Sequence, residues 1–283
     1  MTDRMLVIDA QVHAYEGDTP QRPWTGSLPG PAAVTGEELV AAMARVGVDR
    51  ALLVSPWSLY RSDTSYAVEV CNAHPGRFGL VAPIDPHEID AADTVTAWGS
   101  TPGGVGIRLM AGVTGAFRPD DHQVRGVIGA AVANDLPVCV LCWQQLSIME
   151  QLARLYPDAQ FVLDHLGLTQ PLRPPPPQDP FADLDRVLSL AQYPNVVVKI
   201  TGLCTLSHRP FPFDDLWVPL DRVFASFGID RCMWGTDWTR AVELVDYADS
   251  VAAFRDHLPL AASDRDALMG GTVNRIFGWP AGG

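Results

Sequence analysis

The stretch Cys232-Met233-Trp234-Gly235-Thr236-Asp237 is a short apolar run that ends in a carboxylate. It is the last of eight comparable runs in the chain, at 6–9, 51–55, 79–83, 104–108, 137–141, 160–164, 195–199 and 231–235. Each run is apolar throughout instead of alternating with polar residues, which predicts strands buried on both faces, as in a parallel sheet covered by helices.

Amphipathic segments lie between these runs and predict helices. In 36–46, Thr35 and Glu38 form a capping box and Gly47 is placed to end the helix. A second such helix is predicted at 214–227. Eight strand-then-helix units in 283 residues predict a single α/β domain over residues 1–283, a (β/α)8 TIM barrel with its active site at the carboxyl ends of the strands. An open doubly wound sheet also alternates, but the glycine fingerprint that such a sheet carries after its first strand is missing.

Composition indicates a cytoplasmic protein without a membrane span. Hydrophobic residues make up 47% of the chain, yet no stretch approaches the roughly 20 apolar residues that a transmembrane helix needs, and no secretory signal opens the sequence. The five cysteines are expected to be buried thiols in a reducing compartment. A net charge of -13 argues against a nucleic-acid partner. A homodimer is the commonest assembly for such proteins.

Two stretches interrupt the alternation of strands and helices. Residues 14–35 are rich in glycine and proline and predict a long loop on the rim of the active site. Residues 169–181 include Pro174 to Pro177 in succession. That run is typical either of a docking motif for another domain or of a stiff connector, and we favour the connector.

Several short motifs, most of them at strand ends, are informative because of their order along the chain. They are Asp9-Ala10-Gln11-Val12-His13, Gly106-Ile107-Arg108-Leu109, Asp164-His165-Leu166-Gly167, Asn195 to Leu203, Trp234-Gly235-Thr236-Asp237-Trp238 and Gly271 to Gly278. Over roughly residues 6 to 278 this series resembles the amidohydrolase-related family (amidohydrolase family 2), and within it the lactonases of 2-pyrone-4,6-dicarboxylate and of sugar lactones. The resemblance implies a hydrolase that opens a lactone.

The same resemblance raises the question of a metal. Many members bind Zn or Mn through a His-x-His pair on the first strand, a ligand on strand five or six and the aspartate of strand eight. In this chain Gln11 replaces the first histidine, and Cys142 and Trp143 stand where strand five ends. An amide is a poor ligand for such metals. We therefore expect no cofactor; a bound metal would use His13, His165 and Asp237, with Cys142 as an alternative thiolate ligand.

Catalysis without a metal needs a base for water and donors for an oxyanion. Asp237 lies between two tryptophans, which predicts a raised pKa and the role of general base. Its alternative role is the N-cap of a helix around 242–254. His13 and His165 are the predicted donors to the scissile carbonyl, although a histidine at a strand end is also a common structural group.

Substrate binding is assigned to five side chains: Gln11, Arg108, Arg209, Trp57 and Trp143. The resemblance implies that Arg108 binds a substrate carboxylate or ring oxygen; its alternative is an ion pair with an internal carboxylate such as Asp85 or Asp237. Arg209 is alternatively a solvated loop charge. The aromatic residues near strand ends predict a cyclic or aromatic-derived acid as substrate if at least half of them line the mouth; they are Tyr15, Trp24, Trp57, Tyr60, Trp143 and Trp238.

Three functional classes remain. The leading one is a hydrolase of a lactone or related cyclic ester. The second is a metal-dependent decarboxylase of an aromatic acid, against which Gln11 argues because that reaction depends on a complete metal site. The third is a barrel without catalysis that serves as a binding protein.

Overall fold

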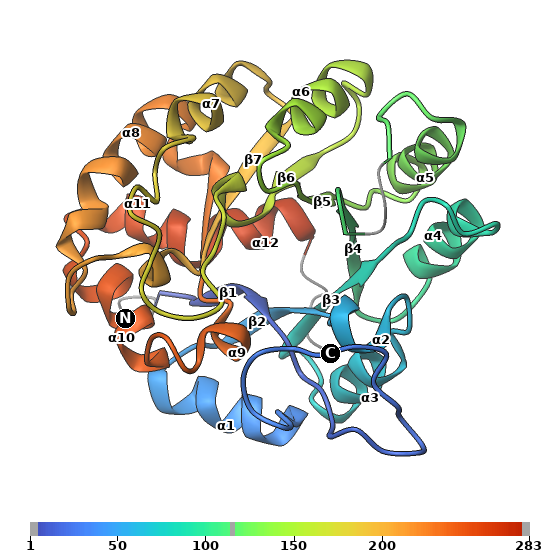
Figure 1. Cartoon of the computed structure of the whole chain (residues 1–283), viewed down its shortest axis with the longest axis horizontal. Coiled ribbons are helices and arrows are strands. Elements are labelled where there is room, and N and C mark those ends of the chain that lie inside the picture. Colours follow the sequence, from blue (N-terminus) through green and yellow to red (C-terminus); the bar gives the residue numbers. More distant parts are fainter. Residues whose placement is uncertain (1–4, 114–116, 279–283) are drawn as a thin grey trace.

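Eight parallel strands form one sheet that curls into a nearly closed barrel (Figure 1). The computed structural model describes residues 5–113 and 117–278, so both ends of the predicted domain 1–283 lie outside the described residues. The strands follow one another in chain order around the barrel: β1 (Ile8–Val12), β2 (Arg50–Val54), β3 (Phe78–Pro83), β4 (Gly104–Met110), β5 (Val138–Leu141), β6 (Phe161–Leu163), β7 (Val196–Thr201) and β8 (Cys232–Gly235). The predicted (β/α)8 barrel is confirmed.

Helices surround the strands and cover the outside of the barrel (Figure 1). They are α1 (Gly36–Val46), α2 (Trp57–Tyr60), α3 (Ser65–Ala73), α4 (Ala91–Gly99), α5 (His122–Ala133), α6 (Leu146–Leu155), α7 (Leu184–Ser189), α8 (Trp217–Phe227), α9 (Trp238–Ala241), α10 (Tyr247–Ala252), α11 (Ala262–Asp266) and α12 (Thr272–Phe277). In the view of Figure 1, α12 lies behind the middle of the barrel.

The helix signals in the sequence are confirmed at two places and fail at a third. The Thr35 hydroxyl accepts from the Glu38 N–H and the Glu38 carboxylate accepts from the Thr35 N–H, at 3.3 and 2.8 Å. The segment 214–227 forms a 3-10 turn followed by α8. The single helix expected at 242–254 is wrong, because the side chain of Asp246 accepts from the N–H of Ala248 at 2.7 Å and starts a separate helix, α10.

The strand that carries the first site residues extends further than its apolar run predicts. β1 spans Ile8–Val12 where the sequence predicts 6–9. Asp9 is fully buried within it because its carboxylate accepts hydrogen bonds from the N–H groups of Gln11 and Thr236, at 3.1 and 2.9 Å. The same interactions draw β8 toward β1, and the N–H of Asp237 donates to the carbonyl of Gln11 at 3.0 Å. The carboxyl ends of the first and last strands are thereby joined.

The barrel interior is apolar at one end and polar at the other. One side of the strands contributes an apolar cluster that includes Ile8, Val81, Val162 and Met233, and α12 adds Val273 and Phe277. Lys199 lies directly above, with its Nζ 5.9 Å from the centre of the Phe277 ring. The charged layer of the barrel therefore rests on a packed hydrophobic plug.

The loop at 14–35 is fixed to the barrel and reaches over its mouth. Tyr15 and Val34 form an antiparallel bridge with two hydrogen bonds of 2.8 Å. Within the loop, Arg22 forms ion pairs with Glu16 and Glu69, at 2.9 and 2.8 Å. Because its two ends and its interior are bonded, the loop presents a defined surface to the active-site side.

The cysteines are free thiols, and Cys139, Cys142, Cys204 and Cys232 are buried as expected, whereas Cys71 on α3 is only partly buried. Within residues 5–113 and 117–278, the helices are too short or too polar to cross a bilayer.

Candidate active site

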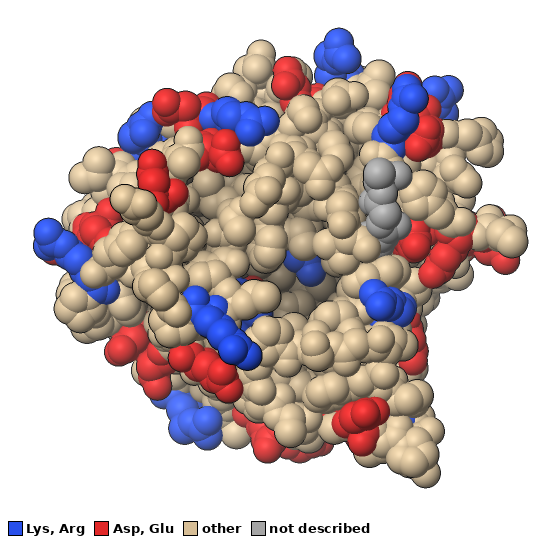
Figure 2. Space-filling view, in the orientation of Figure 1, with Lys and Arg blue, Asp and Glu red and all other residues tan. Residues whose placement is uncertain are grey.

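A pocket of about 350 Å³ opens at the carboxyl ends of the strands, and Figure 2 shows a hollow near the middle of this face with Lys or Arg atoms inside it. Six lining residues, here called the polar floor, can be charged or donate hydrogen bonds: Gln11, His13, Arg108, His165, Asp237 and Arg240. Nine others, here called the apolar wall, are Leu28, Pro29, Pro56, Trp57, Met110, Val113, Leu141, Trp143 and Leu172. Ser27 and Ser58 complete the lining.

A buried ion triad supports one half of the polar floor. Arg108 Nε donates to Asp164 Oδ2 at 2.6 Å, and Lys199 Nζ lies 3.1 Å from Asp164 Oδ1. Burial by itself raises the pKa of the Asp164 carboxyl, but the two cations outweigh burial and hold that pKa well below its usual value. Asp164 is therefore ionised, and the triad of two cations and one anion carries one excess positive charge.

Lys199 also determines which way the amide of Gln11 points. Lys199 Nζ donates to Gln11 Oε1 at 3.3 Å, so the amide nitrogen of Gln11 is turned toward the pocket side. That nitrogen lies 3.4 Å from His165 Nε2, and Arg108 Nη2 lies 3.4 Å from the same atom. Two N–H donors thus converge on one position in the pocket, with contacts long enough for a better acceptor to replace the imidazole nitrogen.

His165 is held as a neutral imidazole. Its Nδ1 lies 2.8 Å from the Thr201 hydroxyl and 3.3 Å from the Thr201 carbonyl, which can only accept, so the proton is on Nδ1. Burial lowers the pKa of His165 to about 4, against the raising effect of Asp237 and Asp164. At neutral pH its Nε2 therefore presents a lone pair to the donors of Gln11 and Arg108.

His13 and Asp237 form the other half of the polar floor. His13 Nδ1 lies 2.7 Å from the carbonyl of Val54, which fixes a proton on Nδ1 and leaves Nε2 facing Asp237 Oδ1 at 3.2 Å. The second oxygen of Asp237 is bound by Arg240 Nε. Arg240 is itself held by the carbonyl of Pro171, to which its Nη1 donates at 2.8 Å. Beyond the His13 contact, Asp237 Oδ1 has no hydrogen-bond partner among the described residues.

The predicted raised pKa of Asp237 is wrong in direction. Burial does raise it, but the guanidinium of Arg240, joined by His13 whenever its Nε2 carries a proton, outweighs burial and holds the pKa well below the ordinary value of an aspartate. The two flanking tryptophans do not set this environment: Trp234 packs against Phe254, and Trp238 stacks on Tyr247. Asp237 is consequently a permanent anion beside His13.

The alternative role of Asp237 as a helix cap applies to its backbone alone. Asp237 occupies the N-cap position of α9 with a φ of 51°, but its side chain makes no capping hydrogen bond. This left-handed conformation, which aspartate tolerates better than most residues, directs the carboxylate toward His13 and Arg240 instead.

The polar floor does not fit a divalent metal. In the part of the chain that the structure describes, no three His, Cys, Asp or Glu side chains are grouped as ligands. Arg240 already binds Asp237, and the donors of Arg108 and Gln11 face the lone pair of His165. A divalent cation there would meet guanidinium groups where it needs ligands. Cys142 is no substitute, because it lies in the hydrophobic core and burial raises its pKa to about 12.

The structure brings most of the predicted site residues together. Asp237, His13, His165, Gln11, Arg108, Trp57 and Trp143 all line one pocket. Arg209 does not join them: it is exposed, 3.4 Å from Asp214. The alternative for Arg108, an ion pair with an internal carboxylate, is confirmed, although the partner is Asp164 and not Asp85 or Asp237. Of the six aromatic residues expected at the mouth, two line the pocket, since Tyr15 packs edge-on against Trp24 and Trp238 stacks on Tyr247. The condition that at least half of them line the mouth is therefore not met.

Sequence reasoning missed Asp164, Lys199 and Arg240 as site residues. Lys199 is a lysine within an apolar strand, fully buried, and such a residue needs an anionic partner. Arg240 follows Asp237 by three positions, a spacing that allows an ion pair at the start of a helix. Both signals were present in the sequence, but the sequence alone does not show that Asp164 is the anionic partner of Lys199.

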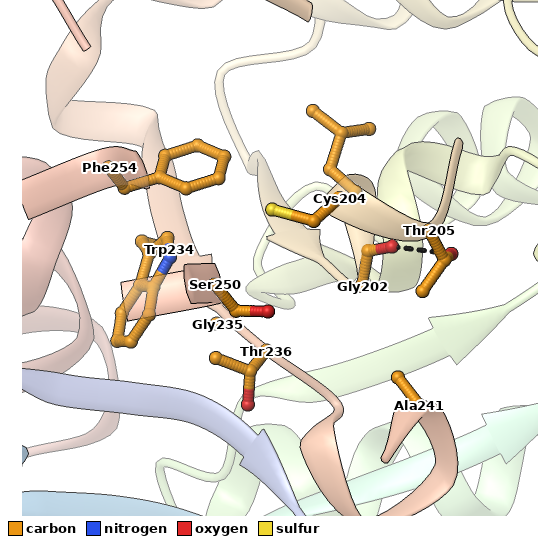
Figure 3. Close-up of a pocket in the computed structure, with 10 residues that line it drawn as sticks. Gly202, Cys204, Thr205, Trp234, Gly235, Thr236, Ala241, Ser250 and Phe254 are labelled. Atoms are coloured by element: carbon orange, nitrogen blue, oxygen red, sulfur yellow. Dashed lines mark hydrogen bonds between the residues drawn. The ribbon is translucent and has the colours of Figure 1, made fainter. Parts of the chain in front are cut away.

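A much smaller cavity lies at the carboxyl ends of β7 and β8, next to α9 and α10 (Figure 3). It has a volume of about 10 Å³, enough for roughly one water molecule. Cys204, Thr205, Thr236 and Ser250 line it, and Figure 3 shows the Thr205 hydroxyl on the carbonyl of Gly202. This space is too small for an organic substrate, so the pocket over the polar floor is the candidate active site.

The chain is similar to several known proteins. A family model described as amidohydrolase matches residues 8–279. A 4-sulfomuconolactone hydrolase of Rhizobium radiobacter is 26% identical over 81% of this chain and 74% of its own. An L-fucono-1,5-lactonase of Burkholderia ambifaria is 30% identical over 71% of this chain and 69% of its own. The crystal structure of an amidohydrolase from Burkholderia multivorans with bound zinc has a TM-score of 0.79 and 25% identity, covering 97% of this chain and all of the other.

The chain belongs to the amidohydrolase family and is a hydrolase.

Proposed function

We propose that this protein hydrolyses a lactone or a related cyclic ester, with water as the nucleophile. One observation carries the proposal: a close pair, His13 Nε2 and Asp237 Oδ1, 3.2 Å apart, lines the same pocket as two converging N–H donors, Gln11 Nε2 and Arg108 Nη2. Ester hydrolysis needs these two elements, a base for water and donors for the oxyanion. The lactone-hydrolysing relatives support the class of reaction.

In the proposed mechanism, His13 accepts the proton of the attacking water. Asp237 has a low pKa and stores a proton poorly, but its fixed negative charge stabilises the imidazolium that forms on His13. Because Nδ1 of His13 is committed to the Val54 carbonyl, Nε2 is the atom that receives the proton. Arg240 holds the carboxylate with its free oxygen toward His13. Asp237 thus acts through His13, and not as the base that the sequence suggested.

The carbonyl oxygen of the substrate binds beside His165 Nε2, where it competes with that nitrogen for the N–H groups of Gln11 and Arg108. As the water oxygen bonds to the carbonyl carbon, negative charge grows on that oxygen and the triad with its excess positive charge stabilises it. The tetrahedral intermediate then expels the ring oxygen, which receives the proton from His13. The product is an open-chain hydroxy acid. His165 contributes by keeping the two donors in place before the substrate arrives.

We propose further that this hydrolysis needs no metal. The positive charge of the polar floor supplies what a Lewis acid supplies elsewhere, since the guanidinium groups of Arg108 and Arg240 line the pocket and Lys199 is bound to Asp164, the partner of Arg108. The decarboxylase alternative, which requires a metal site, is disfavoured by the same donor set. A small-molecule cyclic acid or ester remains the proposed ligand.

Turnover on a panel of lactones tests the proposal. The purified protein should release acid from at least one five- or six-membered lactone, measured with a pH indicator in weak buffer. Asp237→Asn should abolish most of that activity, which excludes a contaminating esterase. If no lactone or cyclic ester in a broad panel is opened, the binding-barrel reading of the sequence replaces this one.

A further inference from the structure

The apolar wall points to a class of substrate that differs from those in the names of the similar proteins. Resting on the proposed lactone hydrolysis, we infer that the substrate is a cyclic ester fused to, or substituted with, an aromatic or alkyl group, and that it carries no more than one negative charge. The proposed mechanism assigns no role to the apolar wall, which is therefore available to bind the rest of the substrate.

The wall has its own packed hydrophobic cluster. Trp57, Met110 and Leu141 are each more than nine-tenths buried and contact one another, with Trp143 packed against them. The Trp143 ring lies 5.7 Å from the ring of His165, so this cluster begins directly beside the reacting position. A substituent next to the scissile ester therefore meets indole, thioether and aliphatic surface, which favours apolar and flat groups.

The wall offers little to a sugar lactone. Apart from the hydroxyls of Ser27 and Ser58 and the unpartnered indole N–H groups of Trp57 and Trp143, the described side chains outside the polar floor carry no hydrogen-bonding group. These groups are few for the several hydroxyls of a sugar ring, and each polar group that is buried unpaired is costly. The described part of the wall therefore lacks the larger set of polar side chains that a site for a polyhydroxylated ring needs.

The charges of the pocket set the second limit. Arg108, Lys199 and Arg240 stand against Asp164 and Asp237, three cations and two anions, which leaves one excess positive charge. That charge balances the oxyanion of the transition state or one carboxylate. Arg61 places its guanidinium over the Trp57 ring but is exposed and does not line the pocket. A dianionic substrate would therefore bring negative charge that the pocket does not neutralise.

Three six-membered cyclic esters separate these classes. They are 3,4-dihydrocoumarin, which is neutral and benzo-fused, D-glucono-1,5-lactone, which is neutral and hydroxylated, and a 2-pyrone with two carboxylates. We expect kcat/KM for dihydrocoumarin to exceed both others by about 100-fold. A ratio under ten against either competitor, with turnover intact, overturns the inference and leaves the proposed function standing.

Two variants locate the selectivity. Met110→Gln keeps the length of the side chain but adds an amide to the wall, and should lower the ratio of dihydrocoumarin to gluconolactone turnover by about tenfold. Val132→Gln is the matched control, because Val132 lies on α5 and is 38% exposed. It should leave the ratio unchanged. An unaltered ratio in a folded Met110→Gln protein would assign selectivity to other residues.

Binding provides a readout that does not depend on catalysis. The open-chain product 3-(2-hydroxyphenyl)propanoate should quench tryptophan fluorescence on titration, since Trp57 and Trp143 line the pocket, whereas gluconate should not. If no lactone is hydrolysed but the aromatic acid binds in this way, the proposed function fails and the substrate class holds. Equal binding of gluconate overturns the class.

Discussion

The two sides of the pocket differ in how they are held together. The charged groups of the polar floor are fixed by buried ion pairs: Arg108 is paired with Asp164, which also binds Lys199, and Asp237 is paired with Arg240. In the apolar wall, Trp57, Met110, Leu141 and Trp143 pack against one another as a hydrophobic cluster. A network of charges tolerates few substitutions, whereas packed apolar groups exchange for others of similar volume at modest cost. The comparison assigns chemistry to the floor and selectivity to the wall.

The largest test of this division removes the pair that activates water. Asp237→Asn keeps the shape of the side chain but loses the charge that stabilises imidazolium on His13, so kcat should fall by about two to four orders of magnitude. His13→Asn should have a similar effect, and the double variant should cost less than the sum of the two. Steady-state kinetics on a hydrolysed lactone measure all three.

The free energy of unfolding of the same variant distinguishes the role of Asp237 as a charged group from a role as a helix cap. Because Arg240 would lose its buried partner, Asp237→Asn should also lower the free energy of unfolding by about 3 kcal/mol or more. Asp214→Asn, in an exposed pair with Arg209, is the control and should change neither quantity. Full activity in Asp237→Asn would place the base elsewhere.

The next test concerns the oxyanion donor of the floor. Gln11→Met retains the volume of the side chain but has no N–H, so kcat should fall by about 10²- to 10³-fold, the usual loss for one such donor. KM should change much less, because the donor acts mainly in the transition state. If KM rises and kcat stays constant, Gln11 is a ground-state binding residue.

The sequence predicts the fold and the position of the site for a simple physical reason. Apolar runs specify strands, and the carboxyl ends of parallel strands meet at one face, so His13, Arg108, His165 and Asp237 had to converge. The electrostatics were not predictable in the same way. The pKa of Asp237 depends on Arg240, whose guanidinium reaches the carboxylate because Asp237 adopts a φ of 51°. Likewise Lys199 orients Gln11 across the barrel, from a strand 188 positions away in the chain.

A third test uses two buried groups of the barrel with opposite dependence on pH. Burial lowers the pKa of His165 to about 4, so between pH 4 and 6.5 the folded protein binds fewer protons there than the unfolded chain, and stability rises with pH. Burial raises the pKa of Asp9 to about 6, so between about pH 4 and 6 the folded protein binds more protons there, and stability falls with pH. Each effect is on the order of 3 kcal/mol.

The opposite pH dependences of stability due to His165 and Asp9 should largely cancel in the native protein. A variant that lacks one of the two groups should therefore show the pH dependence due to the other. Urea unfolding of Asp9→Asn is expected to show stability increasing from pH 4.5 to 6.5, and His165→Asn, which suits the left-handed backbone at that position, should show it decreasing between pH 4.5 and 6. Asp164 and Asp237 stay charged throughout this range because their pKa values are lowered. Parallel profiles in the two variants would show that neither group titrates as its burial implies.

The smallest expected effect is the most direct test of the floor. If the guanidinium groups of Arg108 and Arg240 occupy the positions that ligands of a metal would need, removing metals should leave hydrolysis nearly unchanged. Dialysis against a chelator, followed by metal analysis and kinetics, should find well below one equivalent of zinc or manganese and full kcat. Restoring zinc should add no activity.

Gln11→His supplies a third imidazole ligand near His13 and His165. If this variant gains stoichiometric zinc that the native protein lacks, the amide of Gln11 is what keeps the polar floor free of metal. Loss of activity on chelation, recovered with zinc, would instead mean that the arginines move aside and that the floor and the wall are not divided by charge in the way proposed.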